Sequence, residues 1–134
     1  MKKTYEEADR SATTLKMLYV NPFERIVETR QVEPSLDAYY KLLDCEYIDI
    51  VRRSIRGKYY DIICDDSALL KDFPRISMIN MHHQPMLFGS LLVCLDDGEG
   101  EMVGITDQDV KRIKSDIVIL IDPDGTTPVL RGDY

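Results

Sequence analysis

The run from Leu87 to Leu95, LFGSLLVCL, constrains the fold more than any other segment of the chain. Its side chains are apolar, without the alternation that marks a strand with one face in solvent. Such a continuous run is typical of a strand buried on both faces. We therefore expect Leu87–Leu95 to lie in the middle of a sheet.

The segment after this run predicts a turn and a short return strand. Asp96–Glu101, DDGEGE, combines acidic residues with glycines, which favour a turn. Met102 and Val103 can then return as a brief strand that pairs with the apolar run.

Thr106 carries the clearest helix start in the sequence. Asp109 stands three residues later, the spacing of a capping box, and Ile105 can pack on Val110 as a hydrophobic staple. Val110 and Ile113 continue the apolar face, so we expect a helix from this point.

A hairpin is expected near the start of the domain. It joins Leu15–Val20 to the alternating segment Arg25–Val32 through the turn Asn21–Glu24, where asparagine favours a turn and proline fixes φ. The first strand is predicted to be more buried than the second.

A second hairpin is expected from Glu46–Ile55 to Tyr59–Asp65, with Gly57 in the connection. In its first strand, Ile48 and Ile50 face one side, whereas Val51 and Ile55 face the other. We therefore expect this strand to bulge, twist or extend past the core.

Between the two hairpins, Ser35 is expected to cap a helix over LDAYYKLLD by accepting hydrogen bonds from its first amide groups. The apolar residues recur at a helical spacing and share one face, which we expect to pack on the sheet. They are Leu36, Tyr39, Tyr40 and Leu43.

The chain between Asp66 and Gln84 has weaker signals. Asp66 is expected to cap a short helical turn over Ala68–Leu70, which Pro74 ends. Arg75–Met86, RISMINMHHQPM, shows no clean period, so we expect an irregular, partly apolar connection there.

The C-terminal segment predicts one more strand and an edge. Ile117–Ile121, IVILI, is β-branched and continuously apolar, and a turn at Asp122–Gly125 follows. We expect Thr126–Leu130 to be an edge segment broken by Pro128.

Together these elements predict an α+β fold for the chain of 134 residues. We expect a mostly antiparallel sheet of five to six strands with two main helices packed on one face. Residues 1–14 are interpreted as a flexible polar leader and residues 15–134 as a single domain, in which 117–134 form a C-terminal strand and edge extension.

Several segments also resemble one protein family. They are LKMLYVNP, SLDAYYKLLDCEYIDIV, YYDIICDD, Asn80 ahead of Gly89-Ser90 at the head of LLVCL, and MVGITDQDVKRI. Over Leu15 to Lys114 the chain resembles the family called domain of unknown function 3846. Met81 stands where that family has a basic residue, and Ser90 where threonine is usual. The resemblance implies a habitat in phages, plasmids and conjugative elements of bacteria, and it supplies no catalytic residue.

The charge balance excludes some partners. Seventeen basic against 24 acidic residues give a formal net charge of -7, which argues against general binding of nucleic acid or anionic membranes.

No apolar run approaches the roughly 18 residues that a membrane span needs. The first residues, MKKTYEEADRSATT, have no apolar core, so we expect neither signal peptide nor anchor. The three cysteines form no CxxC pair, and we expect reduced thiols in a cytoplasmic protein.

Two charged clusters are candidates for binding a partner. The basic cluster comprises Arg52, Arg53, Arg56 and Lys58, and the acidic cluster comprises Asp96, Asp97, Glu99 and Glu101. Each can be a solvated hairpin tip or a surface that a group of opposite charge recognises. The acidic loop lacks the ligand pattern of an EF-hand, although its oxygens leave cation binding open.

His82 and His83 are weak candidates for a metal site, since neighbours in an extended chain point to opposite sides. A cysteine nucleophile paired with one of these histidines would be Cys64 or Cys94. Cys94 lies among Leu and Val, and Cys64 precedes two aspartates, so both settings oppose the thiolate.

We therefore expect a non-enzymatic protein-binding module of a phage or mobile element that acts on a host protein, with action against host defence as its most specific form. No metal or cofactor is expected. The alternative is a small metal-dependent or Cys/His-dependent hydrolase. The sequence leaves the partner and the oligomeric state open.

Overall fold

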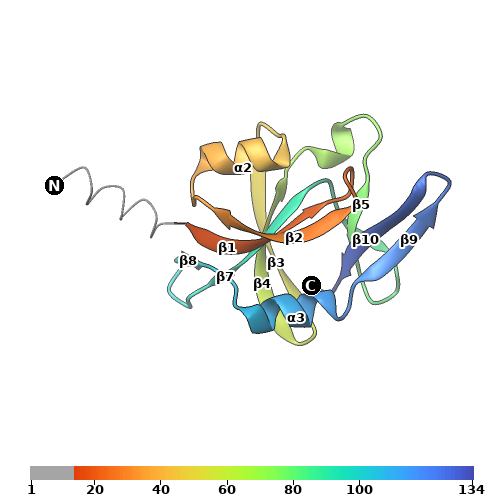
Figure 1. Ribbon diagram of the computed structural model, residues 1–134. Helices are drawn as coiled ribbons and strands as arrows, with labels where there is room; N and C mark the ends of the chain where they lie inside the picture. Colours follow the sequence, from red (N-terminus) through yellow and green to blue (C-terminus); the bar gives the residue numbers. More distant parts are fainter. Residues whose placement is uncertain (1–13) are drawn as a thin grey trace.

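The computed structural model describes residues 14–134, in which two α-helices and two β-sheets form an α+β fold (Figure 1). The predicted leader, residues 1–14, lies outside the described residues except for Thr14. The α+β class is confirmed, but the strands form two sheets where we expected one.

The larger sheet has six antiparallel strands with β7 at its centre. Its strands are β1 (Leu15–Asn21), β2 (Ile26–Val32), β3 (Ile48–Ile55), β4 (Lys58–Asp65), β7 (Leu91–Asp96) and β8 (Met102–Val103). The order is β2-β1-β7-β4-β3, and β8 pairs with the end of β7 that β1 leaves free. Both predicted hairpins and the short return strand are confirmed.

Strand β3 does not bulge. Its register with β4 runs unbroken from Ile48 opposite Asp65 to Ile55 opposite Lys58. Because β3 is the outer strand of this sheet, several of its side chains are exposed on both sides, which explains the mixed sequence pattern.

Strand β7 confirms the buried central strand, but it is shorter than expected. Leu91–Cys94 are fully buried, whereas Gly89 has a φ of 80° and ends the preceding strand. Glycine adopts this left-handed conformation without a Cβ clash. The predicted strand Leu87–Leu95 therefore divides at Gly89, and the residues before it belong to the second sheet.

The smaller sheet has the order β6-β5-β10-β9. Its strands are β5 (Ile76–Ile79), β6 (Pro85–Phe88), β9 (Val118–Asp122) and β10 (Gly125–Arg131). The expectation of an irregular connection over Arg75–Met86 was wrong, because β5 and β6 form a hairpin there. Its register shifts near Met78, which removes the regular period from the sequence.

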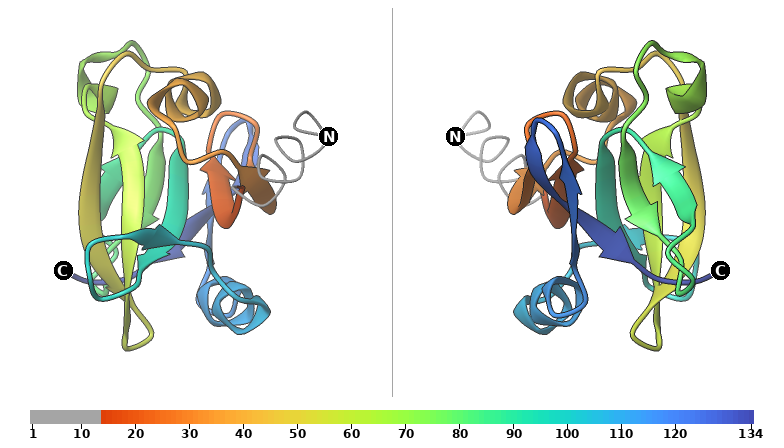
Figure 2. Two further views of the ribbon diagram at one scale, coloured as in Figure 1. Left: turned by 90° about the vertical axis from the view of Figure 1, so that its left-hand side faces the viewer. Right: turned by 90° about the vertical axis from the view of Figure 1, so that its right-hand side faces the viewer.

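Strand β10 also differs from its prediction as an edge. It lies between β9, to which it is antiparallel, and β5, to which it is parallel. Pro128 does not break it and stands opposite Ile119. The edge strand of the smaller sheet is β9. Figure 2 shows the β9–β10 hairpin beside the turn between β1 and β2. There the Arg25 guanidinium donates a hydrogen bond to the Thr127 hydroxyl at 2.9 Å.

The short helical turn η1 (Ala68–Leu70) forms as predicted, but no side chain caps it. The Asp65 carboxylate, and not Asp66, accepts the Ser67 amide at 2.9 Å. The turn ends at Leu70, so Pro74 is not its terminator.

The two helices belong to different hydrophobic clusters. Helix α2 (Leu36–Leu43) is capped by Ser35 as predicted and packs Tyr39 and Leu43 against one face of the larger sheet. Helix α3 (Asp107–Lys114) packs Ile113 in the cluster that also contains buried residues of the smaller sheet. In Figure 1, α2 lies above β1 and β2 and α3 lies below them. Packing of both helices on one face is thus not confirmed.

The capping residue Asp109 is buried, with 1% of its surface exposed. It completes the predicted capping box with Thr106 and accepts hydrogen bonds from Lys58 and Tyr60, both at 2.7 Å. Burial raises the pKa of the Asp109 carboxyl, but the hydrogen bonds from Lys58, Thr106 and Tyr60 outweigh it and hold the pKa well below its ordinary value. Asp109 therefore joins α3 to the β3–β4 hairpin.

We expect Asp109→Asn to lower the free energy of unfolding by about 2–3 kcal/mol at pH 7, because hydrogen bonds to a buried charge are lost. The pKa of Asp109 is depressed in the folded state, so its stabilisation is fully present above the ordinary value of 3.8 and is lost only as the pH falls from there through the depressed folded-state pKa. Urea unfolding at pH 7 and pH 3 should show a smaller deficit of the variant at pH 3 than at pH 7, without full convergence. Asp124→Asn, on an exposed turn, is the control and should match the wild type at both. An equal deficit at both pH values would contradict this role of the carboxylate.

Candidate functional site

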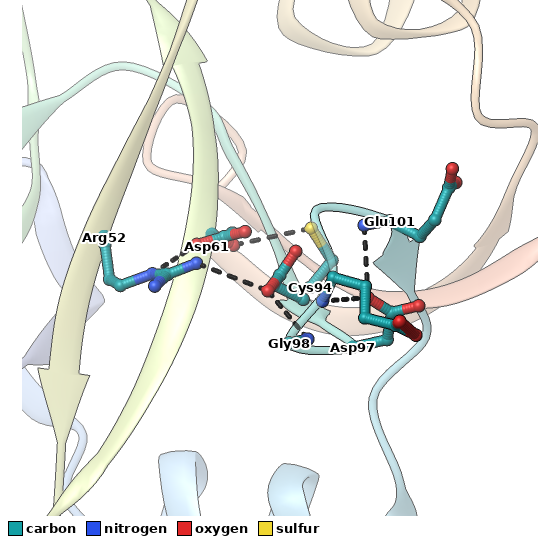
Figure 3. A network of polar contacts seen from close by, with 8 residues as sticks. Arg52, Asp61, Cys94, Asp97, Gly98 and Glu101 are labelled. Carbon is teal, nitrogen blue, oxygen red and sulfur yellow. Dashed lines mark hydrogen bonds and ion pairs between the residues drawn. The ribbon is translucent and has the colours of Figure 1, made fainter.

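The basic cluster predicted from the sequence is largely occupied by internal contacts. Arg52 donates to the Asp61 carboxylate at 3.0 Å and lies 3.8 Å from that of Asp96 (Figure 3). Arg53 stacks over the Tyr134 ring at 4.8 Å, and Lys58 pairs with Asp109. Within residues 14–134, Arg56 alone among the four makes none of these contacts.

The acidic cluster is a loop that its own carboxylates hold together. Asp96 accepts the Gly98 amide at 2.8 Å, and Asp97 accepts the amides of Glu99 and Glu101 at 2.7 and 3.2 Å (Figure 3). The Glu99 and Glu101 side chains are exposed. Because Arg52 reaches Asp96, the two clusters are neighbours on the larger sheet and not separate poles.

The two histidines lie in the exposed turn between β5 and β6. Asn80 organises this turn, since its side chain accepts the amides of His82 and Gln84 at 2.8 and 2.9 Å. No group of three or more His, Cys, Asp or Glu side chains in the described part of the chain could hold a metal ion.

The three cysteines are free thiols, and of these Cys64 and Cys94 are buried. Burial, followed by the charge of Asp49, raises the pKa of Cys64 to about 11. Burial and Asp61 raise the pKa of Cys94 to about 12. Each thiol donates to a backbone carbonyl at 3.5 Å, Cys64 to Asp49 and Cys94 to Asp61. Both settings therefore oppose the thiolate that a nucleophile needs.

A different place on the molecule has the form of a binding site. A cleft of 470 Å³ opens between the C-terminal end of α2, the turn after β1 and the loop from Asp66 to Arg75, hereafter the 66–75 loop. This volume lies in the range of small-molecule pockets. A second hollow of 770 Å³ adjoins it and shares Lys41, Asp44, Asp65 and Lys71.

The floor of this cleft is polar although it is buried. Asn21, Asp65 and Ser90 line it, and they are three of the six buried polar residues in the described chain. The Asn21 amide donates to the Tyr19 hydroxyl at 2.9 Å, which donates to the Leu42 carbonyl at 3.1 Å. This chain of bonds fixes α2 against the sheet.

Lys71 holds the 66–75 loop against the floor of the cleft. Its ammonium lies 2.8 Å from the Asp65 carboxylate and donates to the Asp44 carbonyl at 2.5 Å. The bond with Asp65 is the largest cause of the raised pKa of Lys71. The loop wall is therefore held in place by a partly buried ion pair.

Other polar groups of the cleft are not used internally. Within the described residues, the Ser90 hydroxyl makes no hydrogen bond, although Ser90 is only 5% exposed. The Glu24, Asp44 and Asp72 carboxylates and the Lys41 ammonium likewise make no side-chain hydrogen bond or ion pair in this part of the chain. Free polar groups in a concave place are typical of a binding site.

The 66–75 loop also exposes large apolar side chains. Leu70 and Phe73 are each 86% exposed, and Leu69 is 64% exposed. Phe73 has a φ of 55°, which is uncommon for a bulky residue and implies a strained backbone. Phe23 adds a further exposed ring at the cleft.

Our sequence reasoning missed this cleft, although a signal was present. β1 ends at Asn21, β4 ends at Asp65, and Ser90 directly precedes β7. Antiparallel pairing of β7 with both strands brings these three ends to one edge of the sheet. A polar residue at the end of each apolar strand was thus the available sign. All three also belong to segments by which the sequence resembles a family.

Comparison with known protein families identifies a match over most of the chain. The model of a family described as Domain of unknown function (DUF3846) matches residues 15–117. No curated protein and no solved structure matches the chain. No helix in the described residues is long and apolar enough to cross a membrane.

We expect iodoacetamide at pH 8 to modify Cys45 before the other two cysteines of the folded protein. At that pH only about one Cys64 thiol in a thousand is ionised, given a pKa of about 11. Burial also raises the pKa of Cys45, but its side chain is partly exposed. Mass spectrometry of digests locates the label, and all three should react alike in urea as the control. Labelling of Cys64 or Cys94 as fast as Cys45 without urea would reopen the hydrolase alternative.

Proposed function

We propose that this chain, which belongs to the family described as Domain of unknown function (DUF3846), is a non-enzymatic protein-binding module. We propose further that the 66–75 loop and the cleft beside it form its binding surface. The family resemblance favours a mobile-element setting, in which the partner is a host protein and counteraction of host defence is the most specific form.

The observation that carries this proposal is the exposure of Leu70 and Phe73, at 86% each. Burial of one such side chain stabilises a protein or a complex by roughly 1.5–3 kcal/mol. Side chains of this kind on one loop, beside a cleft, mark a surface that a partner covers. Apolar anchors of this size are the usual centre of a protein interface, and the charged residues around it form the rim.

The position of Phe73 adds to this argument. A bulky residue with φ near 55° costs of order 1–3 kcal/mol and keeps this conformation only where neighbouring structure holds it. Lys71 supplies such a hold, because it fixes the loop to Asp65 and Asp44. A loop that keeps a strained, exposed ring in a fixed place supports a role in recognition.

The charged clusters contribute less to the proposal. Arg52, Lys58 and Asp96 already have partners within the fold, so a binding protein would have to displace those contacts. Arg56, Glu99 and Glu101 stay available, and their part in binding remains a prediction. The hydrolase alternative gains no support from thiols whose pKa is raised.

Capture of partners from bacterial lysate tests the proposal. Immobilised wild type should retain a partner that the double variant Leu70→Ser, Phe73→Ser loses by tenfold or more, since hot-spot side chains contribute over about 1 kcal/mol each. Both side chains are exposed, so the variant should keep the urea midpoint of the wild type.

Ile121→Ser is the matched control, because Ile121 is an apolar residue 83% exposed on β9 of the other sheet. It should retain the partner as the wild type does. Equal retention by the loop variant, or equal loss in the control, would show that the 66–75 loop is not the binding surface.

A further inference from the structure

We infer that the cleft beside the 66–75 loop receives a basic side chain of the partner, an arginine in particular. This inference rests on the proposed function, because the side chain would belong to the protein that the loop binds. It adds the chemical group by which the cleft recognises the partner.

The charge of the cleft favours a cation. Lys71 and Asp65 neutralise one another as an ion pair at 2.8 Å. The remaining charges along its lining are the carboxylates of Glu24, Asp44 and Asp72 against the ammonium of Lys41. The C-terminal end of α2 adds partial negative charge. An anionic ligand would be repelled, whereas a cation would be stabilised.

Ser90 gives an independent reason to expect a ligand here. The residue is only 5% exposed and lines the cleft, and its hydroxyl has no hydrogen-bond partner within residues 14–134. The Ser90 Oγ is not among the enclosed, unpartnered side-chain atoms of the described residues, so it opens into the cleft, where an oxygen without an internal partner can bond a ligand. Ser90 precedes Leu91, which faces the opposite cluster, so Ser90 faces the side on which α2 lies. A hydrogen-bond donor of a ligand in the cleft would give the Ser90 hydroxyl its partner.

Arginine fits the cleft better than a compact cation. A guanidinium has five N–H donors and no acceptor, so one group can serve both the Ser90 hydroxyl and the carboxylates of Asp44 and Asp72. Its aliphatic stem can pack along apolar surface while the charge stays with the carboxylates. Phe23 and Pro74 supply that surface in the lining.

Titration of the full chain with the peptide acetyl-Gly-Arg-Gly-amide, followed by amide NMR, tests this inference. The peptide should shift the amide signals of Ser90, Phe23 and Asp72 in a saturable way. The same peptide with citrulline, which has the shape of arginine without the charge, should bind at least tenfold more weakly.

Two variants of equal charge sharpen the test. Asp72→Asn should weaken binding of the arginine peptide about three- to tenfold, whereas Asp124→Asn, on the exposed β9–β10 turn, should leave the affinity unchanged. Ser90→Ala should weaken it as well. The inference is overturned if citrulline binds equally, if both aspartate variants weaken binding alike, or if the shifts lie outside the cleft.

The two proposals fail separately. Partner capture that depends on Leu70 and Phe73, with no saturable arginine binding, leaves the proposed function standing and removes the inference. Arginine binding in the cleft, with capture unaffected by the loop variant, supports the cleft chemistry and removes the loop as the binding surface.

Discussion

The burial of β7 on both faces is the constraint on which the rest of the structure depends. Leu91 and Val93 face one cluster, and Leu92 and Cys94 face the other, so both sides of the larger sheet must be covered. Helix α2 covers part of one side. The smaller sheet and α3 cover the other. A single sheet with both helices on one face would have left the other face of β7 uncovered.

The sequence predicts the strongly patterned elements of this fold and not their arrangement. Ser35, Thr106 and the two hairpins act through neighbours in the chain, which is why local patterns identify them. The division at Gly89 depends on a backbone angle, and the place of β10 depends on a distant partner, β5. Such long-range pairing leaves little trace in local periodicity.

The candidate site shows the same limit. The charged hairpin ends are conspicuous in the sequence, but tertiary structure pairs Arg52 with Asp61 and Asp96. The cleft is inconspicuous because Asn21, Asp65 and Ser90 are isolated polar residues far apart in the chain. Only the antiparallel arrangement of β1, β4 and β7 brings them together. The dense charges in the sequence therefore mark exposed hairpin ends, whereas the cleft is lined by scattered polar residues at strand ends.

The parallel pairing of Leu130 with Met78 bears on how the protein is made. All strands of the larger sheet precede Gly104 in the chain, so they leave the ribosome before β10 does. At about 5–20 residues per second, a few seconds separate the two events. During that interval the face with Leu18, Ile62 and Val93 lacks β10 as cover. Until β10 joins β5, one side of the larger sheet therefore exposes apolar surface, and slow translation of β9 and β10 would prolong that exposure.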